Sequence, residues 1–505
     1  MAIRIYNTLT RRKDDFVPVS QGKVGIYSCG PTVYDYFHIG NARAFVVPDV
    51  IRRYLTYRGY EVTLVQNITD IEDKIIKRAH ERGVAPADIV AEYVQAFIDD
   101  RTALGVRPPD IQPRATEHVE GMIHMISALI DKGLAYEANG DVYYDVSKFG
   151  EYGKLSGQNI DDLQAGARVD VGELKQDPLD FALWKAAKPG EPAWDSPWGP
   201  GRPGWHIECS VMSTRYLGPV FDIHTGGVDL VFPHHENEIA QSHGANDAVP
   251  VKYWVHNGYV NIDGQRMGKS LGNFKTVRDI LKLYAGRVVR YFLISNHYRK
   301  PINFSDEELR MCGKALARIE DSVTNALFAT GMTDLGLTGL QRAAGAGASA
   351  SSEATLDAAA AAARASFEEA MDDDFNTAGA IAALHDLATA INTYVNQGMA
   401  QGQSEQARAA VARAVLTMLE LGDVVGILDI DTLCRGTSAA VNGGSDGADA
   451  NSLVNELIQL LLDVRADARS IKQYGLSDKI RDRLAEAGIV VEDTKDGARW
   501  KLSAK

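Results

Sequence analysis

The chain has 505 residues, a formal net charge of −14 and 45% apolar residues. It is too long for one compact core, so several globular domains are expected. The negative charge excludes a generally basic surface, and any nucleic-acid site must therefore be a local basic patch.

Membrane insertion and secretion are disfavoured by the sequence. No stretch approaches the roughly 18 consecutive apolar residues of a membrane span, and the start of the chain lacks the apolar block of a signal peptide. Wide spacing of the cysteines is typical of free thiols or metal ligands rather than of a disulfide framework. They are Cys29, Cys209, Cys312 and Cys434. We therefore expect a cytoplasmic protein without membrane contacts.

A strand, a helix and a second strand are predicted near the N-terminus. Residues 24–28 have the pattern of a buried strand, a helical pattern covers 40–59, and a second strand follows at 61–66. In such a unit a ligand binds beyond the carboxyl ends of the strands, at the N-terminus of the helix. The polar residues at that end are Cys29, His38 and Asn41.

The same sheet is expected to resume after an insertion. Residues 73–137 have a helical pattern, and 138–200 are rich in loop residues. A strand then ends in the Gly-Gly pair of "FDIHTGGVDL", and a helix should begin near Pro233 and stop at Gly244. The pair Asp263-Gly264 predicts a hairpin turn within "YVNIDGQRMG".

Two shifts in composition mark boundaries in the second half. An Ala/Gly/Ser-rich tract at about 340–365 blends a loop into a helix, and 435–452 has the composition of a linker. A helical bundle is expected between them. The tail should form two helical segments and a hairpin, and from Arg465 onward it has ten Lys and Arg against seven Asp and Glu. This local excess of positive charge is the kind of patch that the net charge does not exclude.

One set of residue types suits a metal ion. Two thiolates, an imidazole and a carboxylate are ligands that Zn²⁺ accepts, and His234 and Glu238 share one face of a helix because they are four residues apart. The set is Cys29, Cys209, His234 and Glu238. His235 and His243 compete with His234 as ligands. The alternative is that both cysteines are buried structural thiols and the histidines form an exposed helix start.

Two short motifs, "HIGN" and "RMGKSLGN", suit a nucleotide. A helix N-terminus attracts phosphate, His38 adds a donor, and Lys269 on a Gly-flanked loop can reach the phosphates from the other side. The Gly-x-x-x-x-Gly-Lys-[Ser/Thr] pattern is missing from the sequence, which disfavours a P-loop NTPase.

Taken together, the motifs resemble the cysteinyl-tRNA synthetases, a family of class I aminoacyl-tRNA synthetases of bacterial type. The matching segments are "CGPTVYDYFHIGNAR", "NITDIEDKIIKRA", "GRPGWHIECS", "FDIHTGGVDLVFPHHENEIAQS", "MGKSLGNF", "YFLISNHYRKPINFSDEE", "MDDDFNTAGA" and, in the tail, "IRDRLAEAGIVVEDTKDGARW". The resemblance covers almost the whole chain and leaves only the two linkers unmatched.

The resemblance implies an α/β fold: a Rossmann-like parallel-sheet catalytic domain with an insertion, then an all-α bundle and a small C-terminal α+β anticodon-binding domain. The implied boundaries are 1–250 for the catalytic domain, with the insertion at about 115–200, and 251–315 for the signature-loop and stem-contact region. The bundle that binds tRNA then spans 316–434, the linker 435–452 and the anticodon-binding domain 453–505.

The resemblance also implies a reaction and a set of site residues. The enzyme would activate cysteine with Mg²⁺-ATP, release pyrophosphate, and transfer cysteine to the terminal adenosine of tRNA-Cys. One Zn²⁺ per chain, on Cys29, Cys209, His234 and Glu238, would bind the thiolate of the substrate. Thr69, Trp205 and His224 would surround the amino acid. Positions similar to those that contact ATP are His38, Gly40, Asn41, Gly227, Asp229, Arg266, Lys269 and Ser270.

Two features depart from the usual class I signatures. Asn41 stands where many class I enzymes have a second histidine, and Arg266 and Gly268 replace Lys and Ser in the usual Lys-Met-Ser-Lys-Ser loop. Because Lys269 is retained, activation should be retained, while Arg266 and Gly268 should weaken ATP engagement relative to the double variant Arg266→Lys with Gly268→Ser.

Other interpretations remain open at this point. A cysteine:glucosaminyl-inositol ligase of mycothiol synthesis would share the zinc site but lack the full tail, and a non-catalytic zinc-stabilised RNA-binding paralogue would share the fold. Trp500, Arg499 and Arg481 are candidates for stacking on anticodon bases. Lys74 and Lys77 resemble a segment linked to pyridoxal phosphate, although surface lysines are the commoner meaning. The resemblance further implies a monomer.

Overall fold

The computed structural model describes residues 2–158, 174–262, 264–266, 275–332, 335–345, 353–398, 404–428, 447–470, 473–486, 489–494 and 497–502. The chain divides into two compact units, Met1–Cys434 and Arg435–Lys505. None of the helices within these described residues is both long and apolar enough to cross a membrane.

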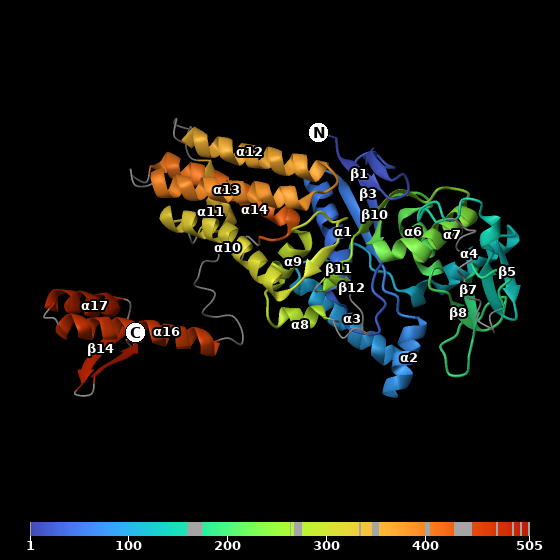
Figure 1. Ribbon diagram of the computed structural model, residues 1–505, viewed down its shortest axis with the longest axis horizontal. Helices are drawn as coiled ribbons and strands as arrows, with labels where there is room; N and C mark the ends of the chain where they lie inside the picture. The colour runs from blue at the N-terminus through green and yellow to red at the C-terminus, as the bar shows by residue number, and fades with distance from the viewer. Residues whose placement is uncertain are drawn as a thin grey trace. The chain divides into compact units, whose positions relative to one another are not determined.

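A four-stranded parallel sheet forms the centre of the first unit, in the order β10-β9-β3-β4 (Figure 1). The strands are β3 (Lys23–Ser28), β4 (Glu61–Gln66), β9 (Phe221–Gly227) and β10 (Val251–Asn257). The first two are joined by helix α1 (Ile39–Tyr57), as predicted. Residues 67–220, which include the insertion, separate β4 from β9, so that strands remote in sequence become neighbours.

Both faces of this sheet are buried, because successive residues of its strands enter different cores. Ile26 packs with the core that contains α1, whereas Tyr27 packs with the second core on the opposite face. Leu64 and Val65 of β4 divide between the two cores in the same way. The apolar runs of these strands are thus explained by helices and loops covering both sides.

The insertion carries an antiparallel sheet of its own, in the order β5-β6-β7-β8. Its strands are β5 (Ala135–Ala138), β6 (Asp141–Tyr144), β7 (Phe181–Ala186) and β8 (Gly201–Pro203). Three helices precede this sheet in the described sequence: α2 (Asp73–Arg82), α3 (Pro86–Ala103) and α4 (Val119–Asp131). Helix α6 (Ile207–Leu217) follows it. In Figure 1, α4, α6 and a further helix, α7 (Glu236–Asn246), lie next to this smaller sheet.

The hairpin predicted within "YVNIDGQRMG" is present as a pair of strands, while Asp263 of the predicted turn lies outside the described residues. Strands β11 (Val260–Ile262) and β12 (Gln265–Arg266) are antiparallel with Ile262 opposite Gln265, and β11 also pairs with β13 (Ile302–Phe304). The N-terminal strands β1 (Arg4–Asn7) and β2 (Arg12–Asp15) form a second hairpin. Short helices α8 (Val277–Leu281) and α9 (Gly286–Ile294) follow β12.

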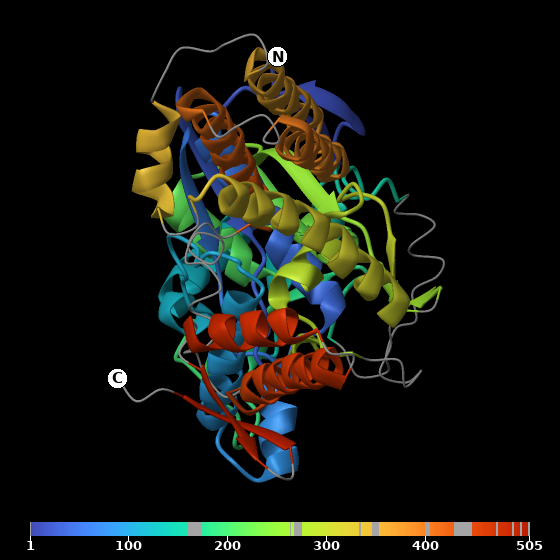
Figure 2. The same cartoon turned by 90° about the vertical axis from the view of Figure 1, so that its left-hand side faces the viewer.

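Within the described residues, five helices form the expected bundle. They are α10 (Asp306–Ala329), α11 (Gly336–Ala344), α12 (Glu353–Asp372), α13 (Thr377–Gly398) and α14 (Glu405–Val425). The long helices lie side by side in both views (Figures 1 and 2). Their apolar residues join the core that contains α1, so the bundle is continuous with one face of the central sheet.

The second unit contains α16 (Gly447–Ser470), α17 (Tyr474–Glu486) and the antiparallel hairpin of β14 (Ile489–Thr494) and β15 (Gly497–Leu502). Ile458, Leu462 and Leu484 form its small core. The order of two helical segments and a hairpin is the one predicted for the tail.

One predicted helix boundary is wrong. Helix α7 (Glu236–Asn246) does not stop at Gly244 but continues to a left-handed Asp247, and a wider turn at Val231–His235 precedes it. Packing, not helix termination, requires a glycine at position 244, because a Cβ atom there would lie 2.7 Å from Leu134 Cδ1 and 3.0 Å from Leu129 Cδ2. The glycine lets α7 approach α4 and its following loop.

Candidate active site

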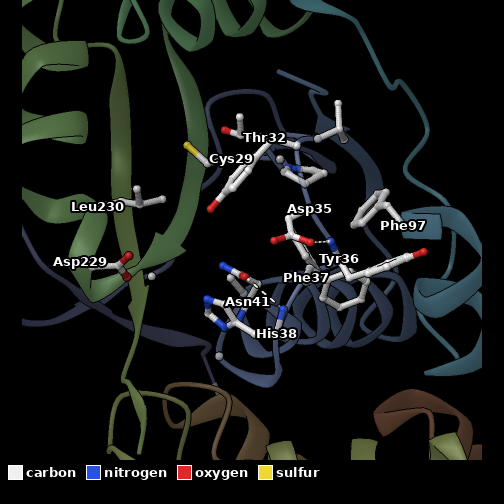
Figure 3. Close-up of a pocket in the computed structure, with 18 of the residues that line it drawn as sticks. Cys29, Thr32, Asp35, Tyr36, Phe37, His38, Asn41, Phe97, Asp229 and Leu230 are labelled. Carbon is white, nitrogen blue, oxygen red and sulfur yellow. Dashed lines mark hydrogen bonds between the residues drawn. The ribbon is translucent and has the colours of Figure 1, made fainter. Parts of the chain in front are cut away.

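A cavity of about 510 Å³ opens at the carboxyl ends of the parallel strands (Figure 3). Cys29 follows β3, Gly227 ends β9 and Asn257 ends β10, while His38 and Asn41 lie at the start of α1. This is the position predicted from the strand-helix-strand pattern. Polar groups from several sequence-distant segments therefore converge on one space.

His38 is the N-cap of α1, and its ring orientation is fixed by the helix itself. Its Nδ1 accepts from the backbone N–H of Asn41 at 3.2 Å, and the Asn41 Oδ1 accepts from the backbone N–H of His38 at 3.4 Å. This reciprocal pair is a capping box. Because Nδ1 is an acceptor, the neutral ring carries its proton on Nε2. Asn41 is thus a structural partner of His38 as well as a cavity residue.

The four predicted metal ligands form one buried cluster. Cys29 Sγ lies 3.9 Å from Cys209 Sγ and 3.7 Å from Glu238 Oε1, and His234 Nε2 lies 3.0 Å from the same carboxylate oxygen. All four ligand atoms lie within 4.8 Å of one another. Ligands that surround one tetrahedral ion at about 2.0–2.3 Å are separated by similar distances. The donor set therefore fits Zn²⁺.

The charges within this cluster support one another. A hydrogen bond from Cys29 lowers the pKa of Cys209 to about 6, against the effect of burial. At His234, burial alone would lower the pKa. The charge of Glu238 and hydrogen bonds to Cys209 and Glu238 outweigh burial and raise the pKa to about 10. His224 and His234 outweigh burial at Glu238 and hold its pKa at about 2. Cys209 and Glu238 are thus prepared to act as anionic ligands.

A second set of four ligands overlaps the first. It consists of Cys29, His224, His235 and Glu238. His235 Nε2 lies 3.3 Å from Cys29 Sγ. The structure therefore leaves both His234 and His235 close enough to serve as the histidine ligand, as the sequence did. The set with His234 contains both thiols, and sulfur ligands suit zinc better than a third nitrogen or oxygen. His243 is not in either set and packs on Phe149 instead.

The residues expected around an amino acid occupy three different environments. Trp205 lines the cavity and packs on the ring of His234, with 4.3 Å between ring centroids. Thr69 is buried and donates to Glu208 Oε2 at 2.7 Å. The Nε2 of His224 lies 2.9 Å from Oε2 of Glu238, one of the predicted metal ligands. Only Trp205 of the three lines the cavity.

The residues expected around ATP are partly described. Gly40, Gly227 and Asp229 line the cavity. A Cβ atom on Gly227 would lie 2.3 Å from Asp229 Oδ1, so the glycine permits that carboxylate to fold back over the strand end. The backbone of Arg266 pairs with Asn261 in the hairpin. Gly268, Lys269 and Ser270 lie outside the described residues.

The remaining candidates lie away from the cavity or at its rim. Lys74 lines the cavity with its ammonium group 5.5 Å from the centre of the Tyr34 ring, and Lys77 is 78% exposed beside Glu81. Arg481 is exposed on α17, near Asp478 and Asp482. Arg499 and Trp500 are described by their backbone alone, which pairs with Glu492 and Val491 in the second unit.

Sequence reasoning missed several polar residues that support the cluster. Glu208 holds Thr69, His206 Nδ1 lies 2.9 Å from His234 Nδ1, and His256 contacts His235. His206 and Glu208 lie within "GRPGWHIECS", the motif that supplies Cys209, and this was the signal available in the sequence. Nothing local to His256 marks it, because its partners come from other segments.

Models of known families match most of the chain. Residues 15–314 match the model described as "tRNA synthetases class I (C) catalytic domain". Residues 366–429 match the DALR domain, and residues 452–500 match "Cysteinyl-tRNA ligase anticodon binding domain".

Curated proteins match over nearly the full length. The chain is similar to the cysteine–tRNA ligase of Heliobacterium modesticaldum, with 50% identity over 502 residues that cover 99% of this chain and 100% of that protein. It is 50% identical to the enzyme of that name from Desulfitobacterium hafniense over 503 residues, with the same coverage of both chains. The Clostridioides difficile protein of the same name is 47% identical and equally well covered.

Solved structures of lower identity share the fold. The Mycobacterium tuberculosis methionyl-tRNA synthetase with methionyl-adenylate gives a TM-score of 0.56 at 15% identity, with 80% of this chain and 90% of that one covered. The arginyl-tRNA synthetase of Thermus thermophilus gives a TM-score of 0.53 at 14% identity, covering 83% of this chain and 84% of its own. The α/β fold with a parallel-sheet catalytic domain and helical additions is confirmed by this likeness.

Proposed function

The chain belongs to the cysteine–tRNA ligase family, and from this premise we propose that it joins cysteine to tRNA-Cys through a zinc-bound substrate thiolate. The observation that carries the proposal is the buried cluster of Cys29, Cys209, His234 and Glu238, whose Cys29 faces the cavity at the strand ends. The family supplies the reaction class, in which ATP activates the amino acid with loss of pyrophosphate.

The cluster gives a physical basis for choosing cysteine over serine. Bound there, zinc would supply a direct bond to the thiolate of the substrate. Serine differs from cysteine by a single atom, and a shaped pocket alone separates such pairs by only about 10–200-fold. A soft thiolate and a hard, reluctantly ionised hydroxyl differ far more as ligands. Trp205, which packs on His234 at the cavity wall, would cover the bound amino acid.

The start of α1 supplies the groups for ATP. His38 presents Nε2–H to the cavity because its Nδ1 is held by the Asn41 amide. The helix dipole adds to the attraction for phosphate at this end. The backbone N–H groups of Ile39 and Asn41 already donate to Lys275 O and His38 Nδ1. We assign the phosphates to this end, with Gly40 beside them, and the nucleoside to Gly227 and Asp229. Lys269, Arg266 and Ser270 would close on the triphosphate, which is bound with Mg²⁺. Activation needs positioning and charge only, since the substrate carboxylate is the nucleophile.

In the second step the amino acid would pass to the terminal adenosine of tRNA. We assign tRNA contacts to the bundle, 316–434, and anticodon contacts to 453–505, with Trp500, Arg499 and Arg481 as the first residues to test. The match of residues 452–500 to an anticodon-binding model favours tRNA over a sugar acceptor. The retained His38 and Lys269 and the match to a catalytic-domain model disfavour a non-catalytic role. Monomeric state and a cytoplasmic location belong to the same proposal.

Cysteine-dependent ATP–pyrophosphate exchange, measured beside zinc content, tests the amino-acid site. In Cys209→Ser, zinc should fall well below one ion per chain and the exchange with cysteine should fall to background, because one of two sulfur ligands is lost. Serine should support no exchange in the unmodified protein. Charging of tRNA-Cys in the same preparations then identifies the acceptor.

Cys312→Ser is the matched control. Cys312 is also a buried thiol, on α10 in the core of the bundle, and it lies outside both ligand sets. It should retain zinc and exchange. Full exchange in Cys209→Ser, or equal loss in both variants, would contradict the proposed role of the cluster.

A further inference from the structure

We propose that Thr8 is a positioning residue for the metal site, because it begins a chain of hydrogen bonds that runs through His256 and His235 and ends on the sulfur of Cys29. The inference deepens the proposed function and rests on it, since it takes Cys29 as a metal ligand. Thr8 lies in the N-terminal hairpin, more than 200 positions from either histidine in the sequence.

The contacts form an unbroken line. Thr8 Oγ1 lies 2.7 Å from His256 Nδ1, and His256 Nε2 lies 2.7 Å from His235 Nδ1. His235 Nε2 then lies 3.3 Å from Cys29 Sγ. His235 has no exposed surface and His256 is 6% exposed, whereas Thr8 is half-buried. Water therefore has little access to the inner part of this line.

The direction of each hydrogen bond in this line follows from its last acceptor, the sulfur of Cys29. Within the described part of the chain, the polar side-chain partners of Cys29 Sγ are Cys209 Sγ, His235 Nε2 and Glu238 Oε1. When Cys209 and Glu238 are anionic ligands, neither can donate, so the hydrogen bond to a Cys29 thiolate has to come from His235 Nε2–H.

This requirement fixes every proton in the line. A neutral His235 that donates from Nε2 must accept at Nδ1, so His256 donates from Nε2 and accepts at Nδ1. The donor to that Nδ1 is then the hydroxyl of Thr8. The threonine thus selects the tautomers of two histidines and, through them, the donor at the metal ligand.

The surroundings hold these groups in place. The backbone N–H of Thr8 donates to Trp254 O at 2.9 Å, and the side chain of Asn7 accepts from Trp254 N–H at 3.1 Å, so the hairpin is pinned beside β10. The Trp254 ring is nearly parallel to that of His256, with 4° between planes. Ring rotation that would break the line is therefore opposed by packing.

Zinc affinity of the full-length protein, measured by competition with a chromophoric chelator, tests the inference. Thr8→Val removes the hydroxyl at almost constant volume and should weaken zinc binding about tenfold, the lower range for partners of a ligand. The absorption of the Co²⁺-loaded protein in the thiolate-to-metal region should shift as well. Thr8→Ser keeps the donor and should restore both values.

Two further variants separate this role from a general effect on the hairpin. Thr10→Val removes a hydroxyl from the same hairpin, where it donates to Asp14 at 2.7 Å, and should leave zinc affinity unchanged. His256→Gln offers an amide donor to His235 that does not depend on Thr8. In that background Thr8→Val should have no added effect, which is the expected result of a coupled pair.

The possible failures are distinguishable. If Thr8→Val binds zinc and gives the Co²⁺ spectrum like the unmodified protein, the inference is overturned while the metal site stands. The inference is equally overturned if Thr10→Val weakens zinc binding to the same degree, or if Thr8→Val still weakens it in the His256→Gln background. If the unmodified protein binds no stoichiometric metal, the proposed function and the inference both fail.

Discussion

Asp49 is a carboxylate with no exposed surface in the middle of α1, and it binds several arginines. Its Oδ2 accepts from Arg290 at 2.7 Å and from Arg53 at 2.8 Å, and its Oδ1 accepts from Arg52 at 3.1 Å. We expect Asp49→Asn to lower the free energy of unfolding by about 3–5 kcal/mol, because the wholly buried Arg290 would lose its counter-charge. Urea unfolding measures this loss.

Asp423→Asn is the control for this prediction, since Asp423 also binds Arg53, at 3.1 Å, but is 57% exposed. Because the Asp423 carboxylate is solvated and Arg53 would keep Asp49 as its counter-charge, this variant should cost no more than an exposed pair, about 0–1 kcal/mol. Equal effects from the two substitutions would show that burial does not govern the strength of these pairs.

The same carboxylate predicts a pH dependence. Burial would raise the pKa of Asp49, but the charges of Arg290 and Arg53 outweigh it and hold the pKa below its usual value. A depressed folded-state pKa stabilises the protein above the unfolded-state pKa, near 3.9, and this contribution is lost as pH falls through the folded-state value. The stability gap between the unmodified protein and Asp49→Asn should be constant above about pH 5 and narrow in acid, in unfolding curves recorded at several pH values. A gap that widens in acid would reverse the assigned sign.

At the scale of elements, one corner of the bundle gives a sharp contrast between neighbouring residues. Asp374 lies between α12 and α13, has no exposed surface, and accepts from Tyr6 N–H at 2.8 Å, Tyr298 at 2.7 Å and Arg299 at 2.7 Å. The adjacent Asp373 is 40% exposed and binds Arg4 and Lys13. Asp374→Asn should cost about 3–5 kcal/mol and Asp373→Asn about 0–1 kcal/mol in the same unfolding assay.

This corner also bears on the active site. Arg43 of α1 donates to the carbonyl oxygens of His297 and Lys300, which flank the residues that Asp374 holds. A loosened loop should disturb the start of α1, so pyrophosphate exchange should fall in Asp374→Asn and not in Asp373→Asn. If Asp374→Asn is destabilised but its pyrophosphate exchange is unchanged, the prediction is wrong, and the contacts of Asp374 contribute to stability without affecting the geometry of the cavity.

Elements whose pattern is local could be predicted from the sequence, and contacts between remote segments could not. The buried-strand pattern in 24–28, the strand at 61–66, the helical pattern between them and the hairpin within 260–266 each report a structure made by neighbouring residues. Gly244 shows the limit, because its meaning depends on Leu129 and Leu134 of another element.

In the candidate site, too, some residues could be predicted from the sequence and others could not. Resemblance to a family brought out the four ligands, which do come together in space. No spacing rule could select Thr8, His256 or Glu208, because each acts on a group that is far away in the chain or belongs to another element. The residues that support the predicted metal ligands are therefore the part that could be found only in the structure.

At the scale of the whole molecule, the division into two units predicts a division of labour. The cavity and the four predicted metal ligands lie entirely in Met1–Cys434. The family match for an anticodon-binding domain, 452–500, lies entirely in the other unit, which has its own small core. A chain that ends after Cys434 should keep zinc and cysteine-dependent pyrophosphate exchange. Its kcat/KM for charging tRNA-Cys should fall at least about tenfold, or 1.4 kcal/mol of binding, because contacts with the outer limb of the tRNA are lost.

Both assays on one preparation make this prediction decisive. Exchange reports the first step without tRNA, so a misfolded truncated chain would lose both activities, whereas loss of a binding unit removes charging alone. The deficit should lie mainly in the KM for tRNA, because a remote contact that is equally strong before and during transfer lowers binding and leaves the chemical step unchanged. Charging that proceeds with an unaltered KM would mean that the bundle alone selects the tRNA, and it would remove the assigned role of 453–505.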